Sequence, residues 1–157
     1  MSSHNGLMSA VDDAADEIAS RCLGLRIRLL DRTLSTIFDR HLRPLGIRIT
    51  QLTLLTAISK TKETGPSELV QMLRLEKSTV SRTIDRLIDH GWIETTAASD
   101  GRSYRIRLTR KGRSKLVEAY PAWQLAQDEA ERMLGATHVS AIRKVGDAVQ
   151  DQPPAKP

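Results

Sequence analysis

Hydroxyl and guanidinium side chains gather on one side of the stretch from 77 to 89, which reads KSTVSRTIDRLID. In a helix, its apolar residues share one face: Val80, Ile84, Leu87 and Ile88. The opposite face carries Ser78, Thr79, Ser81, Arg82, Asp85 and Arg86. Small hydroxyl groups followed by arginines can hydrogen-bond to base edges and phosphates. A solvated amphipathic helix has the same pattern, and this stretch alone leaves both interpretations open.

A shorter helix is expected just before this one. Gly65 can cap its start, Pro66 suits the first helical position, and Glu68 lies near the positive end of the helix dipole. Its apolar positions are Leu69, Met72 and Leu73. Gly91 ends the second helix, as a glycine after the last periodic residue should. The order of short helix, turn and longer helix predicts a helix-turn-helix.

A basic hairpin follows directly. Residues 92–95 and 104–108 read as two strands, and 97–101 supply the turn. On the second strand the apolar Ile106 and Leu108 alternate with Arg105 and Arg107. Thr109 is expected to cap the next helix. A basic hairpin after a recognition helix is a wing, so the balance moves toward nucleic-acid binding.

These segments together resemble the multiple-antibiotic-resistance regulator (MarR) family of bacterial winged helix-turn-helix proteins. The resemblance rests on ELVQMLRLEKSTVSRTIDRLIDHGWIE, on DGR at 100–102, on LTRKG at 108–112 and on HLRPLGIRITQLTLLTAI upstream. It covers roughly residues 17–149. It implies a mainly α (α+β) fold, with a winged helix-turn-helix lobe and long N- and C-terminal dimerisation helices. It also implies a homodimeric repressor of double-stranded DNA, released by a small aromatic or apolar effector.

The resemblance assigns roles to individual residues. It places Ser78, Thr79, Ser81, Arg82 and Arg86 toward the major groove. Arg102 would enter the minor groove, oriented by Asp100 through a charge-assisted hydrogen bond. Lys77, Arg105 and Lys111 are expected to contact phosphates, which position a protein without reading sequence.

Three positions depart from the family pattern. Arg74 stands where a glycine is common in the inter-helix turn, which would change the turn or add a phosphate contact. Glu76-Lys77 replaces Asp-Arg, and Glu is the poorer helix cap. Gly101 removes one cation beside Arg102 in the wing.

The net charge supports a polyanionic partner. The chain has 24 Lys and Arg against 19 Asp and Glu, a difference of +5. Residues 68–115 hold 11 basic and 6 acidic side chains, so this segment also carries 11 − 6 = +5. No large apolar stripe accompanies the basic face, and no signal-peptide pattern begins the chain. A cytoplasmic protein without membrane contact is therefore expected, and its single cysteine fits a reducing compartment.

Long amphipathic helices flank the wing lobe. Helices are expected over 13–41, 111–134 and 139–149, with Pro121 bending the second. Thr50 is expected to cap a shorter helix between the first of them and the lobe. The predicted organisation is a flexible start (1–11), a dimerisation region (12–46 and 113–150), a DNA-binding lobe (47–112) and a flexible tail (151–157). A monomeric helical bundle remains the alternative to a dimer.

Other chemistry has little support in the sequence. The four histidines are scattered, so no metal site or cofactor is expected, and no base accompanies the serines to make an enzyme. Cys22 is a candidate oxidant sensor or a small core residue. Leu52 and Trp123 are expected in the core rather than in an effector pocket. The alternative function is a winged-helix module that binds an acidic protein or RNA without operator specificity.

Overall fold

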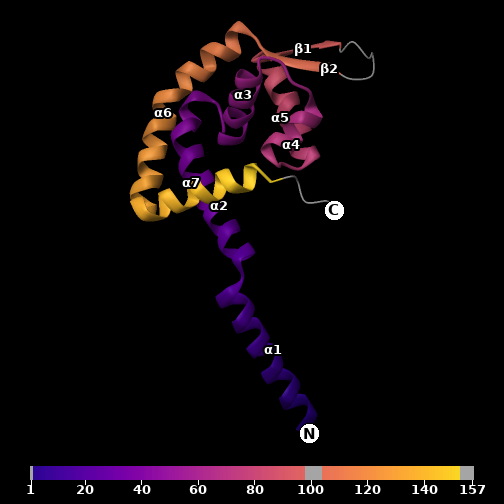
Figure 1. Ribbon diagram of the computed structural model, residues 1–157, viewed down its shortest axis with the longest axis vertical. Helices are drawn as coiled ribbons and strands as arrows, with labels where there is room; N and C mark the ends of the chain where they lie inside the picture. The colour runs from indigo at the N-terminus through magenta and orange to yellow at the C-terminus, as the bar shows by residue number, and fades with distance from the viewer. Residues whose placement is uncertain (1, 98–103, 153–157) are drawn as a thin grey trace. The chain divides into compact units, whose positions relative to one another are not determined.

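The computed structural model describes residues 2–97 and 104–152, which divide into two compact units at Thr36. Helices and one two-stranded sheet make up the fold, so the predicted fold class is confirmed (Figure 1). The elements are α1 (Ser2–Arg21), α2 (Leu23–Leu42), the 3-10 turn η1 (Arg43–Leu45), α3 (Ile49–Thr61), α4 (Pro66–Leu73), α5 (Lys77–Asp89), β1 (Ile93–Ala97), β2 (Tyr104–Leu108), α6 (Arg110–Leu134) and α7 (Ala136–Gln150). The predicted division between a dimerisation region and a lobe does not coincide with these units, because 37–157 form one of them.

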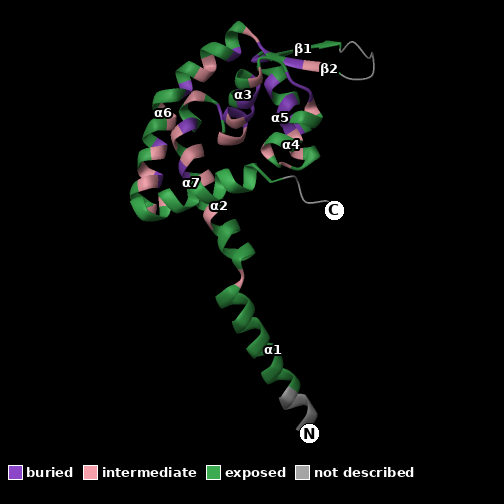
Figure 2. Ribbon diagram, viewed as in Figure 1, coloured by how far each residue is buried: buried purple, intermediate pink, exposed green. Residues whose placement is uncertain are grey.

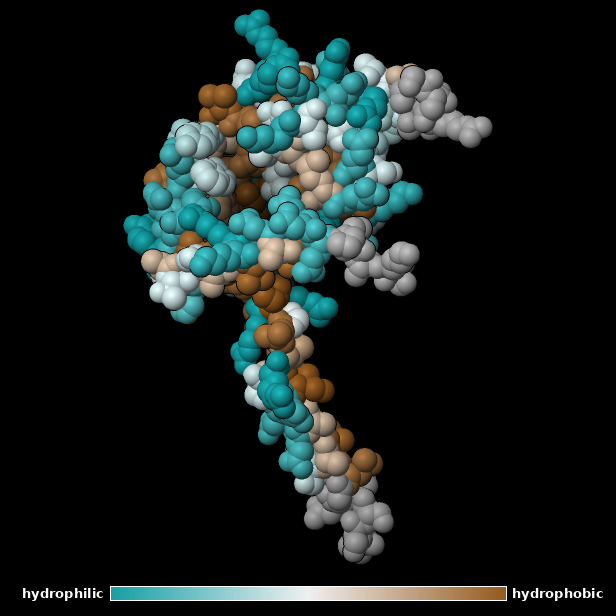
Figure 3. Space-filling model, viewed as in Figure 1, coloured by the Kyte–Doolittle hydropathy of each residue, from teal (hydrophilic) through white to brown (hydrophobic). Residues whose placement is uncertain are grey.

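The first unit is helical almost throughout. The helix expected over 13–41 is instead two helices that meet at Cys22, and helical backbone already begins at Ser2, within the start predicted as flexible. Backbone hydrogen bonds from Cys22 N to Ile18 O and from Arg26 N to Cys22 O span the junction. The large apolar side chains of this segment are exposed (Figures 2 and 3): Leu7, Met8, Val11, Ile18, Leu23, Leu25, Ile27 and Leu29.

The passage from α2 to α3 is set by a carboxylate. The predicted end of α2 at Pro44-Leu45-Gly46 is confirmed, and Gly46 adopts a left-handed φ of 67°. The prediction that Thr50 caps α3 is wrong. Asp39 on α2 accepts a hydrogen bond from Ile49 N at 2.7 Å instead, so the helix begins one residue before Thr50.

The helix-turn-helix forms as its sequence predicts. Gly65 precedes α4, and the Glu68 carboxylate accepts from Gly65 N at 3.2 Å. Glu76 makes no side-chain cap at the start of α5, in line with its poor capping ability. The core face of α5 differs at one place: Ile88 is exposed, and Thr83 is buried because its hydroxyl donates to Thr79 O.

The wing is antiparallel, with Ile93 opposite Leu108 and Ala97 opposite Tyr104. Its first strand begins one residue later and ends two residues later than predicted, while the second matches its prediction. Thr64, just before α4, adds a bridge to Ile106 through backbone hydrogen bonds of 3.1 and 2.7 Å. This bridge joins the helix-turn-helix to the wing.

Gly112 allows α6 to approach the wing closely. Thr109 caps the helix as predicted, since its hydroxyl accepts from Gly112 N at 3.0 Å. A Cβ on Gly112 would lie 1.9 Å from the carbonyl oxygen of Trp92, a distance no side chain can occupy. The glycine of the LTRKG motif is therefore required by contact with backbone, and flexibility is not its role.

The last helix returns to the helix-turn-helix. Arg74, in the turn between α4 and α5, has a left-handed φ of 50°, which a glycine would adopt without strain. Its guanidinium donates to Val149 O at 2.7 Å and also bonds to Gln152 O. Arg74 therefore satisfies carbonyl groups at the end of α7, a role the sequence did not indicate. Of the predicted tail, 153–157 lie outside the described residues.

Among the described residues, no helix has the length and apolar character needed to cross a membrane.

An ionic cluster holds the end of α2 against α6. Glu129 on α6 accepts hydrogen bonds from Arg40 and from His41 Nε2, the latter at 2.7 Å. These bonds, that of Arg40 first, lower the pKa of Glu129 from 4.5 to about 2.

Gly112→Ala should destabilise the protein, because its methyl group would overlap the Trp92 carbonyl. We expect the free energy of unfolding to fall by about 1–3 kcal/mol. Gly146→Ala is the matched control, since Gly146 lies in α7 with nothing within 4 Å of its added Cβ, and it should gain up to about 1 kcal/mol. Urea denaturation at one protein concentration measures both, and equal midpoints for the two variants would contradict the predicted overlap.

Glu129→Gln should flatten the acid dependence of stability. Because the pKa of Glu129 is lower in the folded state, its stabilisation is fully present above pH 4.5 and is lost as pH falls through about 2. Urea midpoints between these pH values should therefore change less in the variant than in the wild type. Asp128→Asn is the control, since Asp128 makes no ion pair within the described part of the chain. The same pH dependence in wild type and Glu129→Gln would refute the role of this cluster.

Candidate nucleic-acid interface

The face of α5 that points away from the core carries the predicted base-reading residues. Val80, Ile84 and Leu87 bury the other side of this helix. The exposed side chains are those of Lys77, Ser78, Ser81, Arg82 and Arg86, and Thr79 is half-buried. Arg82 Nε donates to Ser78 O at 3.2 Å, so this guanidinium lies along its own helix and beside the serine. Hydroxyl and guanidinium donors thus stand together on one solvent-facing surface.

The arginines of the wing strand are paired within the fold. Arg105 donates to Glu68 at 2.6 Å, and Arg107 donates to Glu94 at 2.9 Å. The Arg105 hydrogen bond, followed by those from Thr64 and Gly65, holds the pKa of Glu68 below its ordinary value. Arg105 therefore ties the base of the wing to the first turn of α4. Its contact with a phosphate stays a prediction.

The remaining predicted contacts divide between described and undescribed residues. Lys111 is exposed in the first turn of α6, with its side chain beside Gly91. Asp100 and Arg102, predicted for the minor groove, lie outside the described residues, and so does Gly101. Cys22, the candidate oxidant sensor, is half-buried between α1 and α2, where its Sγ accepts from Leu25 N at 3.4 Å.

Two further arginines come close to α5 through the tertiary fold. Arg43 and Arg48, on either side of the corner between α2 and α3, line a hollow of about 500 Å³ together with Arg86 and His90. Sequence reasoning missed them because the charge surplus is confined to 68–115, and both residues lie upstream of that segment. Their separation from Arg86 along the chain gives no local pattern that could have revealed the cluster.

An apolar hollow of about 650 Å³ lies between the lobe and the C-terminal helices. It is lined from α3, α4, α6 and the end of α7 by residues that include Leu52, Met72, Tyr120, Trp123 and Gln150. Leu52 belongs to the core, as expected, yet it and Trp123 also face this space. Lys60 is the one charged side chain among the lining residues. The space suits a small, mostly apolar molecule with an anionic group.

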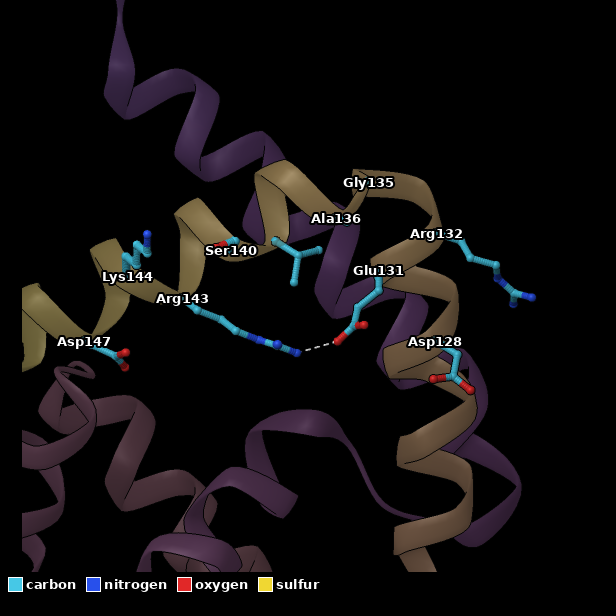
Figure 4. A pocket seen from close by; sticks show the side chains of 10 residues that line it. Asp128, Glu131, Arg132, Gly135, Ala136, Ser140, Arg143, Lys144 and Asp147 are labelled. Atoms are coloured by element: carbon cyan, nitrogen blue, oxygen red, sulfur yellow. Dashed lines mark hydrogen bonds and ion pairs between the residues drawn. The ribbon is translucent and has the colours of Figure 1, made fainter.

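A second hollow, of about 750 Å³, lies in the elbow between α6 and α7 (Figure 4). Its walls are charged, and Arg143 crosses it to donate to Glu131 at 2.6 Å. Arg132 and Asp128 point from α6, while Lys144 and Asp147 lie on α7 (Figure 4). Opposite charges close together here neutralise one another, so the elbow has less anion preference than the corner near Arg86.

Comparison with known proteins places these features in a family. A model of the MarR family matches residues 45–103, which span the helix-turn-helix and the start of the wing. The multiple antibiotic resistance protein MarR of Salmonella typhimurium is 30% identical over 138 residues, covering 86% of this chain and 94% of that protein. MarR of Escherichia coli is 28% identical over 106 residues, or 67% and 72% of the two chains.

Solved structures have the same fold. A mutant MarR from E. coli complexed with operator DNA has a TM-score of 0.74 at 23% identity, covering 85% of this chain and 96% of that one. At that identity the likeness concerns the fold alone. The transcriptional regulator MosR of Mycobacterium tuberculosis, in complex with DNA, has a TM-score of 0.71 at 32% identity, covering 83% and 97% of the two chains.

Proposed function

This chain belongs to the MarR family of DNA-binding transcription regulators, and we propose that it acts as a homodimeric repressor of a pseudo-palindromic operator. The observation that carries the proposal is the exposed face of α5, where hydroxyl and guanidinium groups stand beside a wing. Two such helices related by a two-fold axis would meet two half-sites about one DNA turn apart. The family is one of regulators, and we infer no catalytic activity for this member.

Each predicted contact has a place in this proposal. Ser78, Thr79, Ser81 and Arg82 face base edges in the major groove, and Arg86 continues the same face one turn later. Lys77, Lys111 and Arg105 contact phosphates, with Arg105 doing so from its pair with Glu68. Arg102 enters the minor groove with Asp100 beside it, on the sequence pattern alone.

The dimer is proposed to form through the helices at both ends of the chain. Large apolar side chains are exposed on every one of them. Outside the first unit these are Val117, Tyr120, Leu125, Met133, Ile142, Val145 and Val149. A second copy of this chain would cover such surfaces, while residues 47–112 serve as the DNA-binding lobe and 12–46 with 113–150 as the dimerisation region. A monomeric bundle would leave them in water.

The effector is proposed to occupy the apolar hollow beside α4. A small aromatic acid fits its chemistry, since aromatic and aliphatic walls surround a single lysine. The hollow touches Met72 and Leu73 of α4 and Gln150 of α7, whose last turn is tied to Arg74. A molecule bound there would move the helix-turn-helix against the C-terminal helix. The half-site spacing would then stop matching the operator.

An interaction module for RNA or an acidic protein would use the same basic face. It differs in selectivity, because operator binding requires preference for one duplex over others at equal salt concentration. Redox regulation through Cys22 rests on a lone cysteine without a second supporting observation, and it is not developed further.

Arg82→Ala should relax base preference. We expect the preferred duplex to lose about 1–3 kcal/mol of binding free energy while a scrambled duplex loses little, if Arg82 forms a bidentate contact. Fluorescence anisotropy measures both, using a duplex selected by the wild type from a randomised pool. Arg132→Ala removes an exposed arginine from α6 and serves as the control. Equal losses on both duplexes would assign Arg82 to the phosphate backbone instead.

Lys60→Met should weaken release by an aromatic carboxylate. Benzoate is the probe, and we expect its midpoint for dissociating the DNA complex to rise about threefold to tenfold, the loss of one charge-assisted hydrogen bond at an exposed site. DNA affinity without benzoate should stay unchanged. Benzyl alcohol, which has the same ring without the charge, is the matched ligand and should act equally on both proteins. An unaltered benzoate midpoint would place the effector elsewhere.

A further inference from the structure

The corner where α2 ends and α3 begins forms a basic hollow against the last turn of α5. Its volume is about 500 Å³. The polar side chains that line it are Asp39, Arg43, Arg48, Gln51, Arg86 and His90. They come from three elements that are far apart in sequence, and all lie within the second compact unit. Nothing in the chemistry proposed above uses Arg43 or Arg48.

The acceptors of this hollow are occupied and its cations are available. Asp39 accepts from Ile49 N at 2.7 Å, and Gln51 Oε1 accepts from Arg48 N at 2.9 Å. Arg43, Arg48 and Arg86 are exposed, and none of the three makes an ion pair within the described residues. Three guanidinium groups against one carboxylate leave a surplus of two positive charges, with neutral His90. The arrangement favours an anion.

The side chains, and not the helix end, supply this preference. The first amide groups of α3 are already capped by Asp39 and Gln51, which leaves the N-terminus of the helix little capacity for a ligand. Guanidinium groups present planar forks of N–H donors that match the oxygens of a phosphate. The chemical class that suits the hollow is therefore a phosphate group.

The position of Arg86 identifies the source of that phosphate. Arg82 and Arg86 are four residues apart on one face of α5, so the hollow continues the surface proposed to meet the major groove. Recognition helices read bases with their N-terminal residues. Arg86, in the last turn, then lies nearer to the groove's edge, where the sugar-phosphate backbone passes.

We propose that Arg43, Arg48 and Arg86 form a phosphate site that holds the DNA backbone beside the bases read by α5. This inference rests on the proposed DNA-binding function and adds the α2–α3 corner to the interface. Contacts of this kind set the register and orientation of the protein on the duplex without reading its sequence. The corner belongs to the same compact unit as α5, so it can fix the angle at which the recognition helix enters the groove.

The test measures how DNA binding depends on salt in Arg43→Gln, Arg48→Gln and the double variant. The probes are a labelled duplex selected by the wild type from a randomised pool and a scrambled duplex of equal length. We expect the slope of log K against log salt concentration to fall by about 0.9 for each phosphate that a protomer no longer neutralises. The preference between the two duplexes should be retained. Arg132→Gln, which removes the same charge from α6, should leave the slope unchanged.

Three results would overturn the proposal. A wild-type slope in the double variant would exclude binding to the backbone, while wild-type preference for the selected duplex would leave the DNA-binding function intact. A changed base preference would assign the corner to sequence reading. Inorganic phosphate that raises the Tm more than chloride of equal ionic strength, with the effect abolished in Arg48→Gln, would make the site one for a free anion. A wild type that binds neither duplex would refute the proposed function itself.

Discussion

The main chain of Trp92 holds the recognition helix, the wing and α6 together. Its amide donates to Leu87 O at the end of α5, and its carbonyl accepts from Thr109 N at 3.0 Å, where α6 begins. Gly112 packs directly on that carbonyl, and no residue with a Cβ can do so. The indole is stacked on His90 and has Lys115 Nζ 5.5 Å from its ring centroid. One residue thus sets the angle between the elements that would meet DNA.

Acidic residues divide the basic side chains of this lobe into two groups. Glu68 and Glu94 pair with the arginines of β2, so those cations join the wing to α4 and stiffen the hairpin. The α5 arginines and the α2–α3 corner have no such partners among the described residues, and their charge faces solvent. Net charge alone cannot distinguish the groups. The positions of the carboxylates decide which cations serve the fold and which are available to a polyanion.

The same lobe is joined to the C-terminal helices by polar contacts around an apolar hollow. Arg74 bonds to carbonyl groups at the end of α7, while Glu129 joins α6 to the end of α2. Between these ties, α3, α4 and α6 leave about 650 Å³ lined mostly by apolar side chains. A helix-turn-helix attached at a few polar points and separated by a fillable space can shift as a body. This arrangement gives a physical route from a bound molecule to the recognition helix.

Local chemistry in the sequence determined the helix-turn-helix, the second wing strand, the Thr109 cap and the exposed face of α5, because periodicity and capping act between near neighbours. It did not reveal the Asp39 cap of α3, the break at Cys22, or the roles of Arg74 and Arg105. Nor did it bring Arg43 and Arg48 beside Arg86. Each of these depends on the partner that a side chain meets after the chain has folded back, and spacing along the sequence carries no record of that distance.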